Sequence, residues 1–162
     1  MRITHILKLK NAGEATALFL KTIDPLRSAR RLGPILFQLP PTLKIDTGLL
    51  GEFLAELPKD LRYTFEFRHA SWLTEATYQL LGDHKVALCA AESEKLETPE
   101  VVTADFLYYR LRKPEYSAED RREIAGSAKR MLGEGKDVFV FFKHEDTPDG
   151  ALYAEQILKG VG

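Results

Sequence analysis

The chain has 162 residues, a length that fits one domain with a single hydrophobic core. Hydrophobic residues make up 44% and charged residues 29%, which is typical of a folded globular protein and excludes a disordered or low-complexity chain. The 23 basic residues nearly balance the 24 acidic ones, so the net charge of −1 creates no overall field that draws the molecule to nucleic acid or anionic lipid. Any binding of that kind must be local.

The only cysteine, Cys89, rules out an internal disulfide framework. It lies in the apolar run 86–91, which favours a buried small side chain over a reactive thiol. No apolar stretch approaches the roughly 18 residues of a membrane span, and the N-terminus does not open with a signal-peptide core. We therefore expect no membrane association and a cytoplasmic location.

Strand and helix patterns alternate along the chain. Five runs rich in β-branched and aromatic residues predict strands at 34–39, 62–68, 85–91, 106–111 and 137–142. A helical period predicts helices at 14–23, ending before Pro25, and at 150–159. Because strands that alternate with helices are joined by right-handed crossovers, we expect a parallel α/β fold in one domain spanning 1–162.

Three further helices carry recognisable start signals. Asp46 can cap a helix whose apolar face includes Leu50 and Leu57, and Thr74 can cap a shorter one that ends near 81. Ser117, with Asp120 three residues later, can cap a helix for which Gly133 is a stop signal. The link 92–105 contains Pro99 and has the weakest helical pattern of all.

Four ordered stretches resemble one known family. They are LGPILFQLPP at 32–41, FEFRHASW at 65–72, VVTADFLYYRL at 101–111 and VFVFFKHE at 138–145. Together they are similar to the domain-of-unknown-function-72, or YecE-like, family. The resemblance implies a TIM-barrel-like (β/α) fold with no assigned activity, in which functional residues lie at the carboxyl ends of the strands.

The same resemblance implies that the chain lacks the opening part of the family domain. Family members usually begin with a Gly-Thr-Ser-Gly-Trp-type strand and then a Glu-Ile-Asn-type strand, and neither precedes Met1. The five predicted strands would correspond to strands four to eight of an eight-stranded barrel, which they cannot close. We therefore expect a truncated product, a misplaced start codon, or a half-barrel that covers its open side by self-association.

The strand at 62–68 carries the most informative side chains. Because side chains alternate across a strand, Phe65 and Phe67 share one face, and Glu66 and Arg68 share the other. The phenylalanines suit the helix layer, which directs Glu66 and Arg68 into the barrel. The same alternation groups the remaining candidate inward residues, which are Gln38, Tyr108, Arg110 and Lys143.

These residues predict an acid–base site with Glu66 and His69 as catalytic groups. The arginines, Lys143 and His144 would bind an anionic ligand, together with Gln38 and Tyr108, because guanidinium groups grip carboxylates and phosphates. An internal ion-pair layer that only fills the barrel explains the charges equally well. For His69 a solvated or backbone-bonded loop histidine is the competing interpretation, and for Trp72 it is a packing anchor rather than a stacking platform.

Three functions are consistent with the pattern. The first is an enzyme that acts on a small phosphorylated or carboxylated substrate. The second is a nucleic-acid-binding or phosphodiester-processing module, for which the cations are Arg27, Arg30, Arg31, Arg112 and Lys113; a solvated helix face explains the first three as well. The third is an inactive fragment. No cofactor motif and no metal-ligand spacing is present in the sequence.

Overall fold

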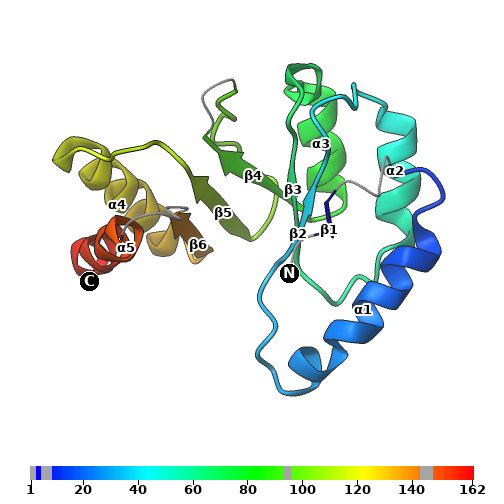
Figure 1. Cartoon of the computed structure of the whole chain (residues 1–162), viewed down its shortest axis with the longest axis horizontal. Helices are drawn as coiled ribbons and strands as arrows, with labels where there is room; N and C mark the ends of the chain where they lie inside the picture. Colours follow the sequence, from blue (N-terminus) through cyan, green and yellow to red (C-terminus); the bar gives the residue numbers. More distant parts are fainter. Residues whose placement is uncertain (1–2, 5–8, 93–95, 143–147) are drawn as a thin grey trace. The chain divides into compact units, whose positions relative to one another are not determined.

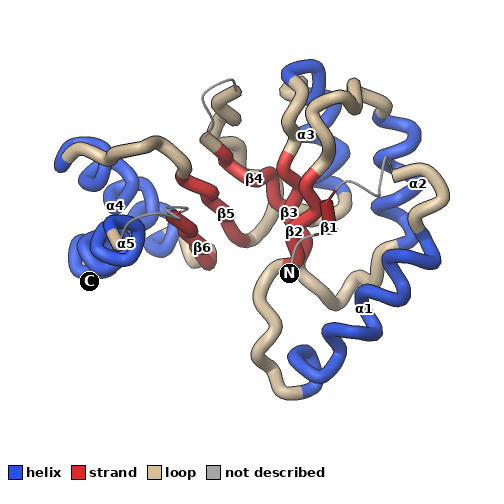
Figure 2. The backbone as a smooth tube through the Cα atoms, viewed as in Figure 1, coloured by secondary structure: helices blue, strands red, loops and turns tan. Residues whose placement is uncertain are grey.

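The computed structural model of the chain describes residues 3–4, 9–92, 96–142 and 148–162. It divides the chain into two compact units, Met1–Val86 and Ala87–Gly162, which we describe one at a time. Figure 1 labels the helices and strands, and Figure 2 separates them by colour. Both units are built from parallel strands and helices, which confirms the predicted α/β class. The expectation of a single domain stays a prediction.

The first unit contains three strands and their helices. In chain order the elements are β1 (Ile3–Thr4), α1 (Gly13–Ser28), β2 (Ile35–Gln38), α2 (Thr47–Glu56), β3 (Tyr63–Glu66), the short 3-10 helix η1 (Ala70–Trp72) and α3 (Glu75–Asp83). The three strands are parallel, with β2 between β1 and β3. The register places Phe37 beside Phe65 and Gln38 beside Glu66. The sequence did not predict β1, because a two-residue strand carries no period.

The start signals of α2 and α3 are confirmed. Asp46 accepts a hydrogen bond from the Leu49 backbone N–H at 2.9 Å, and Thr74 accepts one from Thr77 at 3.4 Å. The predicted end of α1 before Pro25 is wrong, since the helix continues to Ser28. Pro25 lies in the last turn of α1, and its carbonyl still accepts a hydrogen bond from the Ala29 N–H at 3.1 Å, so the turn closes although Pro25 itself has no N–H to donate.

Aromatic rings form the core of this unit. Phe37 and Phe65 stack with their ring centres 5.1 Å apart, and Phe53 of α2 meets both rings edge-on. All three residues are buried. The phenylalanine face of β2 and β3 therefore lies against the helix layer, as predicted, and Gln38 and Glu66 follow on the opposite face.

The second unit also contains three parallel strands. Its elements are β4 (Ala87–Ala91), β5 (Phe106–Leu111), α4 (Ala118–Gly133), β6 (Asp137–Phe142) and α5 (Asp149–Val161), with β5 between β4 and β6. The bounds of β5 and β6 match the prediction. Within its described residues, the link between β4 and β5 forms no helix. Cys89 is fully buried in β4, which confirms its assignment as a small core residue.

The core of the second unit lies between its strands and α4 and α5, which run side by side in Figure 1. It is centred on Leu107, Tyr109, Tyr116 and Met131. The predicted capping box is confirmed, because the Ser117 hydroxyl accepts from the Asp120 N–H at 3.1 Å and the Asp120 carboxylate accepts from the Ser117 N–H at 2.8 Å.

Three helices, α1, α3 and α4, each end in the same type of turn, with one residue in the left-handed region. The turns that follow α1, α3 and α4 hold Arg30, Lys85 and Gly135 in the left-handed region, with φ of 55°, 56° and 77°. In the turn after α3, the Lys85 N–H donates a hydrogen bond to the Gly82 carbonyl oxygen at 3.0 Å. The Val86 N–H donates one to the Leu81 carbonyl oxygen at 2.9 Å. Only one of the three turns has the glycine that this geometry favours.

Candidate functional site

The carboxyl ends of β2 and β3 hold a buried polar pair. The Gln38 Nε2 amide donates a hydrogen bond to the Glu66 Oε1 carboxylate oxygen, and the two atoms are 2.6 Å apart. Gln38 is 4% exposed and Glu66 is 3% exposed. A buried carboxylate is costly unless hydrogen bonds replace its hydration, so the amide stabilises Glu66 in a defined position. The parallel register creates this contact, because it places the two residues side by side.

Arg68 lies beyond the end of β3. The strand ends at Glu66, Phe67 is buried, and Arg68 is exposed on the segment that leaves the strand. The predicted strand is therefore two residues too long at this end, because Arg68 no longer follows the ladder. An exposed guanidinium group two residues from a buried carboxylate can meet a ligand that arrives from solvent.

His69 caps the 3-10 helix with its ring. Its Nδ1 accepts from the Ser71 backbone N–H at 3.1 Å and lies 2.9 Å from the Ser71 hydroxyl, which itself accepts from the Ile45 N–H. This is the backbone-bonded histidine that competed with the catalytic interpretation. Because Nδ1 is the acceptor, the neutral ring carries its proton on Nε2, and that N–H can donate to a ligand.

Trp72 is a packing residue. Its side chain is fully buried and stacks on Phe67 with the ring centres 4.8 Å apart. Its indole N–H donates to the Leu43 carbonyl oxygen at 2.8 Å. The ring anchors the segment before α2 to the segment after β3, so the packing interpretation describes it and the stacking platform does not.

The second unit holds two more of the predicted residues. Tyr108 and Arg110 are buried on β5, and Tyr108 packs against Phe139 and Phe141 of β6, with ring centres 6.3 Å and 4.9 Å away. Tyr109, between them, belongs to the core that faces α4, so the predicted alternation along β5 holds. Lys143 and His144 lie outside the described residues.

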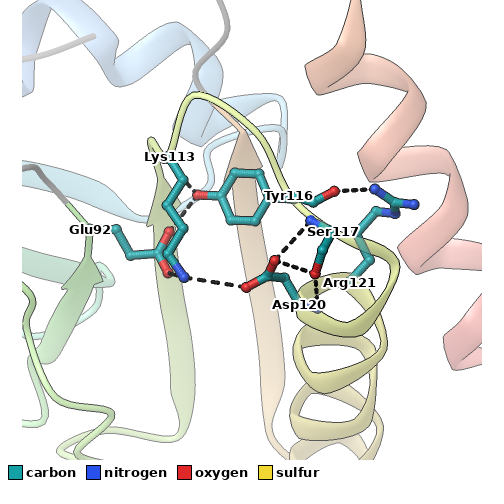
Figure 3. Close-up of polar contacts among 6 residues, drawn as sticks. All are labelled: Glu92, Lys113, Tyr116, Ser117, Asp120 and Arg121. Atoms are coloured by element: carbon teal, nitrogen blue, oxygen red, sulfur yellow. Dashed lines mark hydrogen bonds and ion pairs between the residues drawn. The ribbon is translucent and has the colours of Figure 1, made fainter.

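A polar cluster that the sequence did not predict follows β4 and β5 (Figure 3). The Tyr116 hydroxyl donates to the Glu92 carboxylate and accepts from the Lys113 N–H at 3.0 Å. The Lys113 ammonium lies 3.4 Å from both Glu92 and Asp120. Glu92 comes directly after the predicted strand at 85–91, and this position is the feature of the sequence that could have indicated a polar cluster here.

The charge states of this cluster follow from its contacts. Burial, together with the hydrogen bond to Glu92, raises the pKa of the Tyr116 hydroxyl. Burial lowers the pKa of Lys113, but the carboxylates of Glu92 and Asp120 outweigh that effect and the net shift is upward. The hydrogen bond from the Ser117 hydroxyl lowers the pKa of Asp120. Tyr116 therefore stays protonated and Lys113 stays charged. In these states their contacts hold the segment before α4 against Glu92.

The described part of the chain has neither a metal-binding cluster nor a membrane-spanning helix. Among those residues, no group of three or more His, Cys, Asp or Glu side chains could hold a metal ion. Over the same ranges, no helix combines the length and the apolar character needed to cross a membrane.

The fold and the polar strand ends define a protein of parallel strand–helix units with candidate binding residues after its strands. The chain belongs to the family described as protein of unknown function DUF72, which matches residues 1–162. The resemblance drawn from the four sequence stretches is confirmed at the level of this family. No curated protein matches the chain.

Solved structures of two relatives support the fold. Two crystal structures of a DUF72 family protein from Enterococcus faecalis match with TM-scores of 0.75 and 0.79 at 21% and 19% identity, covering 87% and 94% of this chain. A DUF72 family protein from Thermotoga maritima matches with a TM-score of 0.71 at 26% identity over 93% of this chain. The chain spans 65% or 66% of the length of these structures.

Proposed function

We propose that the chain carries the acid–base part of an enzyme site for a small anionic substrate, phosphorylated or carboxylated, at the carboxyl ends of β2 and β3. The observation that supports this proposal most strongly is the buried Glu66 carboxylate, held by Gln38 at 2.6 Å. In parallel α/β folds, ligands bind beyond the carboxyl ends of the strands, which is where this pair lies.

Each residue has a distinct role in this proposal. Glu66 accepts a proton from the substrate, and Gln38 fixes the direction of its carboxylate. Arg68 binds the anionic group of the substrate from the exposed side. His69, with its proton on Nε2, donates a hydrogen bond to substrate oxygen rather than acting as the base. Tyr108, Arg110, Lys143 and His144 stay predicted ligand-binding residues.

A panel of phosphorylated and carboxylated metabolites tests the proposal by calorimetry and by turnover. Arg68→Ala should weaken binding of the responding compound about tenfold, which corresponds to the loss of one charged hydrogen bond. Glu66→Gln should keep binding and lose turnover, because the amide preserves the shape and removes the base. Arg31→Ala removes an exposed arginine elsewhere in the unit and should change neither. If Arg68→Ala and Glu66→Gln leave binding and turnover at the wild-type level while the fold persists, the proposal fails.

A further inference from the structure

The two units of the chain carry opposite net charges. Residues 1–86 contain 12 basic and 9 acidic residues, a net charge of +3, and residues 87–162 contain 11 basic and 15 acidic residues, a net charge of −4. The near-neutral total of the chain therefore hides a basic first unit. Because a polyanion responds to local charge, the first unit is the part of the chain that can attract one.

Many cations of the first unit lie in the turns that lead into strands. Three turns, at residues 29–34, 57–62 and 83–86, precede β2, β3 and β4. Because β2 and β3 are parallel, their turns lie at the same end of the sheet, and Figure 1 shows both chain segments reaching the strands from that end. Glu66 lies at the opposite end of β3, so these turns are separate from the enzyme site proposed above.

Side-chain contacts hold the three turns next to one another. Arg27, in the last turn of α1, pairs with Asp60 of the second turn. Lys59 of the second turn donates to the Leu54 carbonyl oxygen at 2.8 Å and lies 3.3 Å from Nδ1 of His84 in the third turn. The turns therefore form one continuous surface, which we call the basic rim. Its exposed cations are Arg27, Arg30, Arg31, Lys59, Arg62 and Lys85.

Carboxylates offset only part of the charge of the basic rim. The three carboxylates beside it are Asp24, Asp60 and Asp83. Arg27 lies next to the first two of them, and six cations against three carboxylates leave a net charge of +3. Within the described part of the chain, no ion pair engages Arg30, Arg31 or Lys85, and all three side chains are exposed. Their charged groups are therefore accessible to a partner from solvent.

The placement of these cations suits an extended polyanion. They stand on separate turns, so a ligand that meets several of them at once must carry negative charges at intervals, as a phosphodiester backbone does. No Phe, Tyr or Trp occurs in the three turns, and stacking on unpaired bases is therefore not available. The basic rim suits a duplex better than a single strand.

A lipid surface suits the basic rim less well. Proteins that lie on membranes combine cations with apolar side chains that insert between the lipids. The leucines of the turns, Leu32, Leu57 and Leu61, are buried or half-buried. Leu26 of α1, which is 49% exposed, is the one exposed leucine next to them, and a single leucine is a weak anchor.

We propose that the basic rim binds the phosphate backbone of double-stranded nucleic acid without sequence preference. The residues that contact phosphates are Arg30, Arg31, Lys59 and Lys85. Lys59 keeps one N–H for this contact, because its other two serve Leu54 and His84. Lys113, which the sequence grouped with these cations, lies in the other unit against two carboxylates and takes no part. The proposal does not depend on the function proposed for Glu66.

Fluorescence anisotropy of a short labelled DNA duplex, titrated with the whole chain, tests the proposal. We expect saturable binding at about 50 mM salt that weakens about 100-fold at about 200 mM, because four phosphate contacts give a slope of about −3 to −4 for the logarithm of the association constant against that of the salt concentration. A duplex of unrelated sequence should bind equally well, and the single strand should bind more weakly.

The backbone at two of the cations allows binding to be separated from stability. Arg30 and Lys85 occupy left-handed positions that favour glycine, with φ of 55° and 56°. Arg30→Gly combined with Lys85→Gly should therefore stay folded, raise the Kd at least about tenfold and make the salt slope shallower by about 2. Lys129→Ala combined with Lys159→Ala removes two exposed lysines from the second unit and should bind as the wild type does. This control has the same net charge as the glycine variant.

Vesicles of phosphatidylserine and phosphatidylcholine distinguish a membrane from nucleic acid as the partner. Four outcomes overturn the proposal. They are no duplex binding at about 50 mM salt, binding to the vesicles but not to the duplex, tighter binding to the single strand than to the duplex, and an equal Kd for the glycine variant and its control.

Discussion

Replacement of Gln38 by leucine tests the central contact of the candidate site. The variant keeps the approximate size of the side chain but leaves the Glu66 carboxylate without its amide donor, in a place where Glu66 is only 3% exposed. A hydrogen bond to a charged group contributes roughly 1.5–3 kcal/mol to stability. We expect Gln38→Leu to lower the free energy of unfolding by about 2 kcal/mol.

Urea unfolding followed by Trp72 fluorescence measures this cost, because the single tryptophan is fully buried in the same unit. Gln79→Leu is the matched control: it removes a glutamine–carboxylate bond of 2.8 Å that is exposed, and should cost less than about 0.5 kcal/mol. The double variant Gln38→Leu with Glu66→Leu should be more stable than the sum of the two single changes predicts, by about 1 kcal/mol or more. Equal costs for Gln38→Leu and Gln79→Leu, or strict additivity in the double variant, would refute the reasoning.

Three further predictions concern helix ends. Ser117→Ala should lower the free energy of unfolding by about 1 kcal/mol, measured by circular dichroism in urea, since it removes half of the capping box; an unchanged midpoint would contradict this. The pKa of Asp120 is lowered in the fold, so its contribution is present above its ordinary value of 3.8 and is lost as the pH falls through the folded value. Asp120→Asn should therefore be less stable than the wild type at neutral pH, with a difference that shrinks in acid; a constant difference would count against it. Arg30→Gly should raise the free energy of unfolding by up to about 1 kcal/mol, because glycine adopts the left-handed backbone conformation of Arg30 without steric strain. A lower free energy of unfolding would show that contacts of the arginine side chain outweigh this strain.

Local signals predicted the elements of both units well. Helix caps at Asp46, Thr74 and Ser117 depend on residues three positions apart, so the sequence contains everything that the contact needs. The strand bounds at β5 and β6 matched because polar residues flank both apolar runs. The error at Pro25 arose because a proline is a weak stop in the last turn of a helix, where few further backbone bonds depend on it.

The candidate site was only partly accessible from sequence. Alternation along β3 separated Glu66 from Phe65, but the contact between Gln38 and Glu66 depends on the register of two strands 28 positions apart. The hydrogen bond between Tyr116 and Glu92 joins residues 24 positions apart across a loop, so no repeating sequence pattern predicts it.

The strand β6 has a practical consequence for handling this protein. None of its six residues is buried, and Phe141 is 47% exposed, although the sequence DVFVFF has one charge and strong β propensity. Short segments of this kind promote intermolecular strand pairing at high concentration. Purified samples should therefore be kept dilute and tested with an amyloid-sensitive dye, and Phe141→Lys, at the exposed position, is the first substitution to try where the chain is needed at millimolar concentration.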